Sequence, residues 1–143
     1  MKQPVVLSIR GQQTYLGQDP EVIELVTEGT MEYRDGGWDL SYEESALTGL
    51  EGVTTTFRVL PDQVTLTRTG KLHSEMVFRV GEVHESLYRV EFGALMLSVM
   101  ASRVQTNITE EDGGVIDLTY AIEIEQTAAG VIDYHLDIKP KRV

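Results

Sequence analysis

The chain has 143 residues, 41% of them hydrophobic and 24% charged, which suits a folded protein with a buried core and argues against disorder. It contains no cysteine, which excludes disulfides, thiol catalysis and thiolate metal sites and fits a reducing compartment. Its net charge of −11 disfavours nucleic acid as a partner, because an acidic surface repels phosphate.

Targeting and membrane signals are not expected. The apolar patch before Arg10 is only six residues long, too short for the core of a signal peptide. No apolar run approaches the roughly 20 residues of a membrane-spanning helix. We therefore expect one soluble, cytoplasmic domain over residues 1–143, with no membrane partner.

The first half of the chain alternates apolar and polar residues with the period of a β-strand. A hairpin turn is predicted at Asp35–Gly37 and another turn at Pro61–Gln63. A short helical turn fits the pattern around 44–50. The strands predicted here span 5–11, 22–34, 38–44, 53–60 and 64–70.

The second half continues in the same way, with strands predicted at 71–80, 87–93, 94–108, 115–126 and 131–140. A second helical turn fits around 82–86. Residues 94–108 are apolar on both faces for several positions, which indicates a strand that is covered on both sides or that forms an association surface. We expect Ala94, Met96 and Met100 to lie at the subunit interface of a homodimer.

Many hairpin-connected strands with one apolar face each must close into a barrel or stack as a sandwich. The length of these strands favours the barrel. The predicted fold class is all-β, an antiparallel up-and-down barrel of about 8–10 strands. Such a barrel holds side chains or one small ligand.

Several stretches also resemble the YwiB-like family of uncharacterised bacterial proteins, a domain of unknown function. The resemblance runs over nearly the whole chain and implies a lipocalin-like, or calycin-like, barrel, but no activity. The stretches that carry it are SYEE at 41–44, VTLTRTG at 64–70, FRVG at 78–81, YRVEFGALMLSV at 88–99 and GGVIDLTYAIEI at 113–124.

Two charged residues fall on apolar strand faces. Arg68 shares its face with Val64 and Leu66, and Glu44 shares its face with Tyr42. An unpaired buried charge costs several kcal/mol, so each ion needs a partner or a route to water. We expect Arg68 and Glu44 to lie close together at one end of the barrel, unless a β-bulge near Gly70 reverses the alternation.

Three roles for this pair remain open. It is a structural ion pair, or Arg68 anchors a carboxylate or phosphate, or Glu44 is a general base beside an electrostatic Arg68. A non-catalytic barrel that binds a small anionic or amphipathic molecule is the favoured function, with a filled-core interaction module as the alternative and an enzyme third. The predicted ligand contacts are Trp38, Tyr42, Glu44, Arg68 and Tyr88.

No cofactor or metal site is expected. Asp133, His135 and Asp137 alternate along one strand, but residues two apart stand about 6.5 Å from one another, too far to converge easily on one ion. We expect them on a solvated outer face. His73 and His84 have no evident nucleophile or carboxylate partner in the sequence.

Overall fold

The computed structural model describes residues 2–15 and 18–141, with the backbone alone for Thr48 and Val90. The described chain folds into strands joined by short turns, with one 3₁₀ turn. The elements are β1 (Gln3–Thr14), β2 (Glu21–Arg34), β3 (Gly37–Glu43), η1 (Ala46–Thr48), β4 (Val53–Leu60), β5 (Gln63–Gly70), β6 (Ser74–Phe78), β7 (Val83–Val90), β8 (Gly93–Thr109), β9 (Gly113–Ile124) and β10 (Thr127–Pro140).

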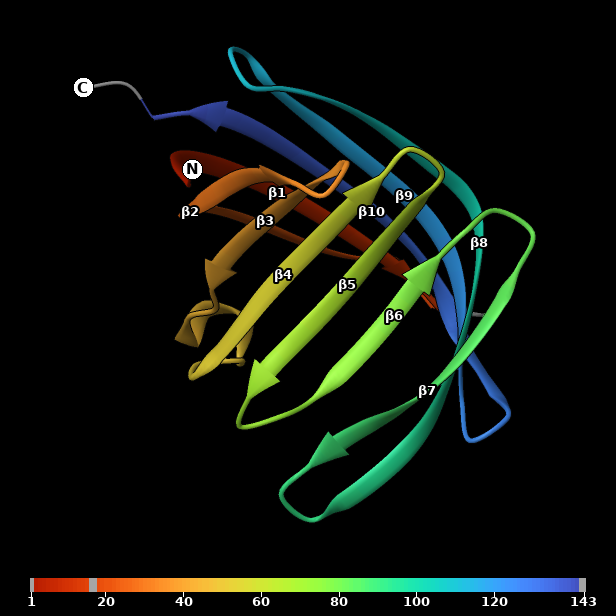
Figure 1. Cartoon of the computed structure of the whole chain (residues 1–143). Coiled ribbons are helices and arrows are strands. Elements are labelled where there is room, and N and C mark those ends of the chain that lie inside the picture. The colour runs from red at the N-terminus through yellow and green to blue at the C-terminus, as the bar shows by residue number, and fades with distance from the viewer. Residues whose placement is uncertain (1, 16–17, 142–143) are drawn as a thin grey trace.

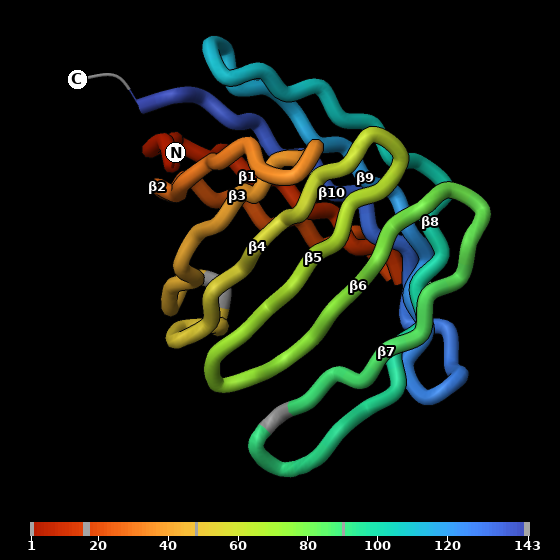
Figure 2. Tube along the Cα trace, in the orientation of Figure 1, coloured from red at the N-terminus to blue at the C-terminus, as the bar shows by residue number. Residues whose placement is uncertain are grey.

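The strands form one antiparallel sheet that curls into a nearly closed barrel (Figure 1). Each strand pairs with its neighbours in sequence except β6 and β7, and β1 also pairs with β10, from Val5↔Pro140 to Thr14↔Val131. The discontinuity lies between β6 and β7 (Figure 2), where one isolated bridge, His73↔Arg89, joins the residue before β6 to β7. The predicted all-β barrel is confirmed.

Alternation along the strands directs the apolar side chains inward. In β4 every second residue from Val53 to Val59 is buried, and in β10 Leu136 and Ile138 are buried in the same way. Aromatic rings fill the middle, where Phe78 packs on Tyr120 with ring centroids 4.4 Å apart. The central part of the barrel is therefore packed with side chains.

Strand β8 changes which of its faces points inward. Ala101 pairs with Tyr120 and Arg103 with Thr119, so Ser102 is an extra residue, a β-bulge. Odd-numbered residues such as Val99 face the core before the bulge, and even-numbered residues do so after it. The bulge explains part of the apolar character that the sequence shows on both faces of 94–108.

Two predicted helical turns have different outcomes. The turn expected around 44–50 is present as η1, where the Ser45 hydroxyl accepts a hydrogen bond from the Leu47 N–H and Gly49 ends the turn with φ 75°. The turn expected around 82–86 is absent, because β7 already begins at Val83. No helix among the described residues is long and apolar enough to cross a membrane.

Candidate functional site

A row of inward-facing residues crosses four neighbouring strands near one end of the barrel. Tyr42 of β3 lies opposite Thr55 of β4, Thr55 opposite Arg68 of β5, and Arg68 opposite Ser74 of β6. The β4–β5 register continues without a shift to Gly70, so no bulge reverses the alternation. Arg68 therefore faces inward, as its position beside Val64 and Leu66 predicts.

Glu44 lies one step nearer the barrel end than Tyr42, and its backbone N–H donates to the Val53 carbonyl at 2.8 Å. Its side chain is only 2% exposed and accepts a hydrogen bond from the Thr55 hydroxyl at 2.6 Å. The distance from Arg68 Nε to Glu44 Oε2 is 3.9 Å. The two charges thus lie close together, as expected, but at a distance too long for a direct hydrogen bond.

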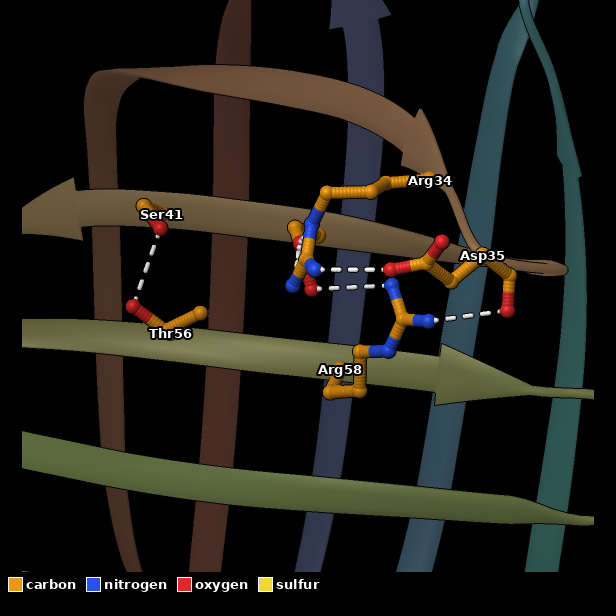
Figure 3. A network of polar contacts seen from close by, with 6 residues as sticks. Arg34, Asp35, Ser41, Thr56 and Arg58 are labelled. Atoms are coloured by element: carbon orange, nitrogen blue, oxygen red, sulfur yellow. Dashed lines mark hydrogen bonds and ion pairs between the residues drawn. The ribbon is translucent and has the colours of Figure 1, made fainter.

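Arg68 differs from the arginines on the outside of the same sheet. There Arg34 donates to Asp39 at 2.8 Å, and Arg58 donates to Asp39 at 3.2 Å and to the Asp35 carbonyl at 3.1 Å (Figure 3). The Nε atom of Arg68 is buried and has no hydrogen-bond partner among the described residues. Since nearly all buried polar groups in proteins are hydrogen-bonded, this N–H needs a physical explanation.

Three tyrosines complete the polar end of the barrel. The hydroxyl groups of Tyr42 and Tyr134 lie 3.4 Å apart. Burial raises the pKa of Tyr42 to about 12, and burial also raises the pKa values of Tyr120 and Tyr134. All three phenols are therefore neutral at physiological pH and can both donate and accept hydrogen bonds.

These side chains line a cavity of about 230 Å³ at this end of the barrel, which we call the end cavity. Arg68, Glu44 and the three tyrosines form its polar part. Its apolar part comes from strands β1, β2 and β10 and from the loop after η1, through Ile9, Ile23, Leu25, Leu50 and Ile132. The end cavity therefore offers both charged and apolar surface to one small molecule.

A second depression, the β6–β7 groove, lies along the discontinuity in the sheet and has a volume of about 600 Å³. Polar side chains from β5, β6 and β7 line it. Arg68 is the one residue of the described chain that lines both this groove and the end cavity. Beside it, the Ser74 hydroxyl is buried and has no hydrogen-bond partner among the described residues.

Two predicted ligand contacts lie elsewhere. Trp38 is four residues before Tyr42 on β3, a distance of about 13 Å, and packs edge-to-face on Tyr33 beside the β2–β3 turn. Tyr88 is on β7 and lines neither the end cavity nor the β6–β7 groove. The structure thus brings Tyr42, Glu44 and Arg68 together around the end cavity, which Trp38 and Tyr88 do not line.

Four residues of the site were missed by sequence reasoning about function. Thr55 and Ser74 interrupt apolar strand faces just as Arg68 does, and that signal could have found them. Tyr120 and Tyr134 share their strand faces with apolar residues such as Leu118 and Leu136, a pattern that indicates core positions. Their hydroxyl groups reach the site only because β9 and β10 lie across the barrel from β3, which no local pattern reveals.

The acidic residues of β10 lie on the outside, as predicted. His135 bonds to Asp117 of β9 through Nδ1 and to Asp137 through Nε2, the latter at 3.0 Å, while Asp133 accepts from Thr119. The hydrogen bond with Asp117 is the main cause of a raised His135 pKa. Within residues 2–15 and 18–141 no cluster of three metal-binding side chains occurs.

The family described as "Domain of unknown function (DUF1934)" matches residues 7–138. The chain belongs to this family. The match confirms the resemblance to YwiB-like proteins. Among proteins with curated descriptions, none matches the chain.

The structure resembles the crystal structure of the ywiB protein from Bacillus subtilis. The TM-score is 0.87, the sequence identity is 23%, and the match covers 99% of this chain and 94% of that chain. At this identity the likeness shows a shared fold, and function has to be argued from the site.

Proposed function

We propose that this DUF1934 barrel binds a small amphipathic acid in its end cavity, with Arg68 as the anchor for the acidic group, and that it does so without catalysis. The observation that carries the proposal is the buried Nε–H of Arg68, which has no hydrogen-bond partner among the described residues and belongs to a side chain that lines a cavity with apolar surface. Guanidinium groups bind carboxylates and phosphates through paired N–H donors.

The size of the end cavity limits the ligand. Pockets for drug-sized molecules measure about 300–1,000 Å³, whereas this cavity measures about 230 Å³. The middle of the barrel is filled by side chains such as Phe57 and Phe78, which are fully buried. We therefore expect a ligand smaller than a typical drug, with its apolar part toward Ile9 and Leu25.

The pair of Arg68 and Glu44 is compatible with this role. Glu44 is oriented by Thr55, so its carboxylate partly neutralises Arg68 without taking up the Nε–H. An arginine has five N–H donors, and the Nε–H of Arg68 is not bonded to this carboxylate, which lies 3.9 Å away. The hypothesis that Glu44 is a general base has less support, since its side chain is almost completely buried.

Native mass spectrometry of gently purified protein, beside the denatured sample, tests the proposal. We expect a discrete extra mass on the native protein that is lost on denaturation. Arg68→Met should abolish it. Arg58→Met is the matched control, because the Arg58 side chain is 22% exposed against 20% for Arg68 but lies on the outer face.

A bare chain mass is followed by an NMR titration with octanoate. Chemical-shift changes confined to the end cavity, lost in Arg68→Met and kept in Arg58→Met, would support the proposal. A bare mass together with no octanoate-induced change would overturn it.

Self-association is a second candidate function, carried by an apolar strip on the outer face. Val83, Met100, Ala121 and Val131 lie side by side on β7, β8, β9 and β10, and Val83 and Met100 are 60% and 46% exposed. This strip includes Met100 of the predicted interface. Large apolar side chains gathered on an exposed face mark association surfaces.

Light scattering coupled to size-exclusion chromatography tests this second candidate. A dimer that dissociates in Met100→Lys and persists in Val26→Lys would support it. Val26 is a suitable control because it is 70% exposed on β2, away from the strip. A monomeric wild-type protein at high concentration would rule it out.

A further inference from the structure

We propose that the acidic group of the ligand is held by Arg68 and Ser74 together, and that the β6–β7 groove receives the part of the head group that extends beyond them. This inference rests on the proposed function and specifies the chemical class of the ligand. The ligand is an oxyanion-bearing amphiphile, either a carboxylate or a phosphate monoester.

The first support is the position of the two donors. Arg68 and Ser74 are direct cross-strand partners on β5 and β6, and both side chains face inward. Cross-strand partners have Cβ atoms about 4.5–5.5 Å apart. One oxyanion is therefore able to accept hydrogen bonds from both side chains.

The second support is that both donors are unsatisfied. Arg68 Nε and Ser74 Oγ are the two buried side-chain nitrogen or oxygen atoms of the described chain without a hydrogen-bond partner. Ser74 is only 5% exposed. Burying a hydroxyl or a guanidinium N–H without a partner is unfavourable, and an oxyanion satisfies both groups at once.

The third support is the shape and chemistry of the surroundings. Arg68 lines the end cavity on one side and the β6–β7 groove on the other. The groove walls carry imidazole, hydroxyl and guanidinium groups from His73, His84, Ser86 and Arg89, together with the carboxylates of Glu75 and Glu85. The ligand tail thus has apolar surface in the end cavity, and the head group has hydrogen-bond donors in the groove.

The discontinuity in the sheet explains why this groove exists. Instead of continuing the ladder, β6 and β7 meet at the His73↔Arg89 bridge and at a weaker contact from the Val77 N–H to the His84 Nδ1 at 3.4 Å. An unbroken β6–β7 ladder would leave no opening in the wall beside Ser74. The gap between consecutive strands therefore gives a head group access to the pair from the side.

Isothermal titration calorimetry with octanoate, octyl phosphate and neutral 1-octanol tests the inference. Ser74→Ala should weaken binding of the acids about tenfold, the loss expected for one hydrogen bond to a charged group, and should leave 1-octanol unchanged. Ser41→Ala is the matched control, since the Ser41 hydroxyl already bonds to Thr56 at 2.9 Å. Thermal melts verify that each variant is folded.

A second variant separates charge from geometry. Arg68→Lys keeps the positive charge but removes the Nε–H, so we expect this variant to lose most of its affinity for both acids.

The two acids distinguish the head groups, because tighter binding of octyl phosphate identifies a phosphate monoester and tighter binding of octanoate identifies a carboxylate.

The possible failures are distinguishable. If Ser74→Ala binds both acids like the wild type while Arg68→Met does not, the end cavity binds acids but the Arg68–Ser74 site is wrong. If wild-type protein binds neither acid, the inference and the proposed function both fail.

Discussion

Arg68 belongs to the buried charge pair of the site and is also the proposed anchor for the ligand. Its side chain is 20% exposed and lies 3.9 Å from a carboxylate that is almost completely buried. Removing one member of a buried pair leaves the other charge without compensation, which is more unfavourable than losing both. The contribution of the pair to the free energy of unfolding is therefore measurable on ligand-free protein, apart from its role in binding.

A double-mutant cycle on ligand-free protein measures this coupling. We expect Arg68→Met and Glu44→Gln each to lower the free energy of unfolding by about 2 kcal/mol, and the double variant to lower it by about 1 kcal/mol less than their sum. Urea denaturation gives these values. Strict additivity would show that the two charges do not interact, and the cycle of Arg58→Met with Glu44→Gln provides an additive reference.

His135 offers a prediction about pH. Its hydrogen bond to Asp117, with a further one to Asp137, raises its pKa above the ordinary value of about 6.5. The folded state therefore binds the imidazolium proton more tightly than the unfolded state does. The resulting stabilisation is fully present below about pH 6.5 and is lost as the pH rises through the folded pKa.

The measurement compares the unfolding free energies of wild-type protein and His135→Asn from about pH 5.5 to about pH 8.5. The advantage of the wild type should shrink as the pH rises, by an amount that screening keeps small because the side chain is 42% exposed. Asp117→Asn should lower the pKa of His135 in an NMR titration, whereas Asp133→Asn, which removes a bond to Thr119, should not. A His135 pKa at or below 6.5 would contradict this account.

At the scale of the elements, one glycine of β2 allows β2 and β3 to lie close together next to Tyr42 of the site. Gly29 is the cross-strand partner of Tyr42. A Cβ atom there would collide with the Ser41 carbonyl oxygen and would lie 3.0 Å from Leu7 Cδ1 and 3.2 Å from Tyr42 Cβ. The backbone cannot move away without distorting the ladder.

Gly29→Ala is therefore expected to lower the free energy of unfolding by about 1–3 kcal/mol, the range for overpacking a core, and to weaken ligand binding by displacing Tyr42. Gly11→Ala is the control, because its Cβ would meet only Tyr134 Cδ2 at 3.8 Å, an ordinary contact. Chemical denaturation of both variants checks the difference. Equal stabilities would show that the collision is relieved at no energetic cost.

Sequence reasoning succeeded where the information is local to one strand. Alternation placed Arg68 and Glu44 on inward faces correctly, because a strand reverses its side chains every residue. It did not separate Trp38 from Tyr42, since residues that share a face can still lie at opposite ends of a strand. It also missed the extra residue Ser102, which no local pattern distinguishes from an ordinary strand position.

The same limit applies between strands. The nearness of Tyr134 to Tyr42 depends on closure of the sheet through the β1–β10 ladder. The opening beside Ser74 likewise depends on the divergence of β6 and β7, two strands joined by a short turn that would ordinarily form a hairpin. Both are consequences of the closed sheet as a whole and cannot be derived from segment patterns.

For the whole molecule, the β1–β10 ladder brings the two ends of the described chain together, with the Lys141 N–H donating to the Pro4 carbonyl at 3.0 Å. A circular permutant that joins residues 3 and 141 by a short flexible linker and opens the chain between Val80 and Gly81 keeps every ladder of the sheet. We expect it to fold with an unfolding free energy within about 2 kcal/mol of the parent.

A permutant opened at Asp35–Gly36 is the control, because that turn holds the Arg34 and Arg58 contacts of Figure 3. It should have the lower urea midpoint of the two. The opposite order would mean that the β6–β7 turn contributes more to stability than its hydrogen bonds suggest.

The β1–β10 ladder has a further consequence for how the protein is made on the ribosome. Strand β1 leaves the exit tunnel before the other strands of the barrel, yet one of its edges has no partner until β10 has been translated. Throughout that interval its Val5, Leu7 and Ile9, which are buried in the finished barrel, belong to a strand with an open edge. Open apolar edges invite pairing with other chains, so this interval is the one in which the nascent chain is most exposed to aggregation.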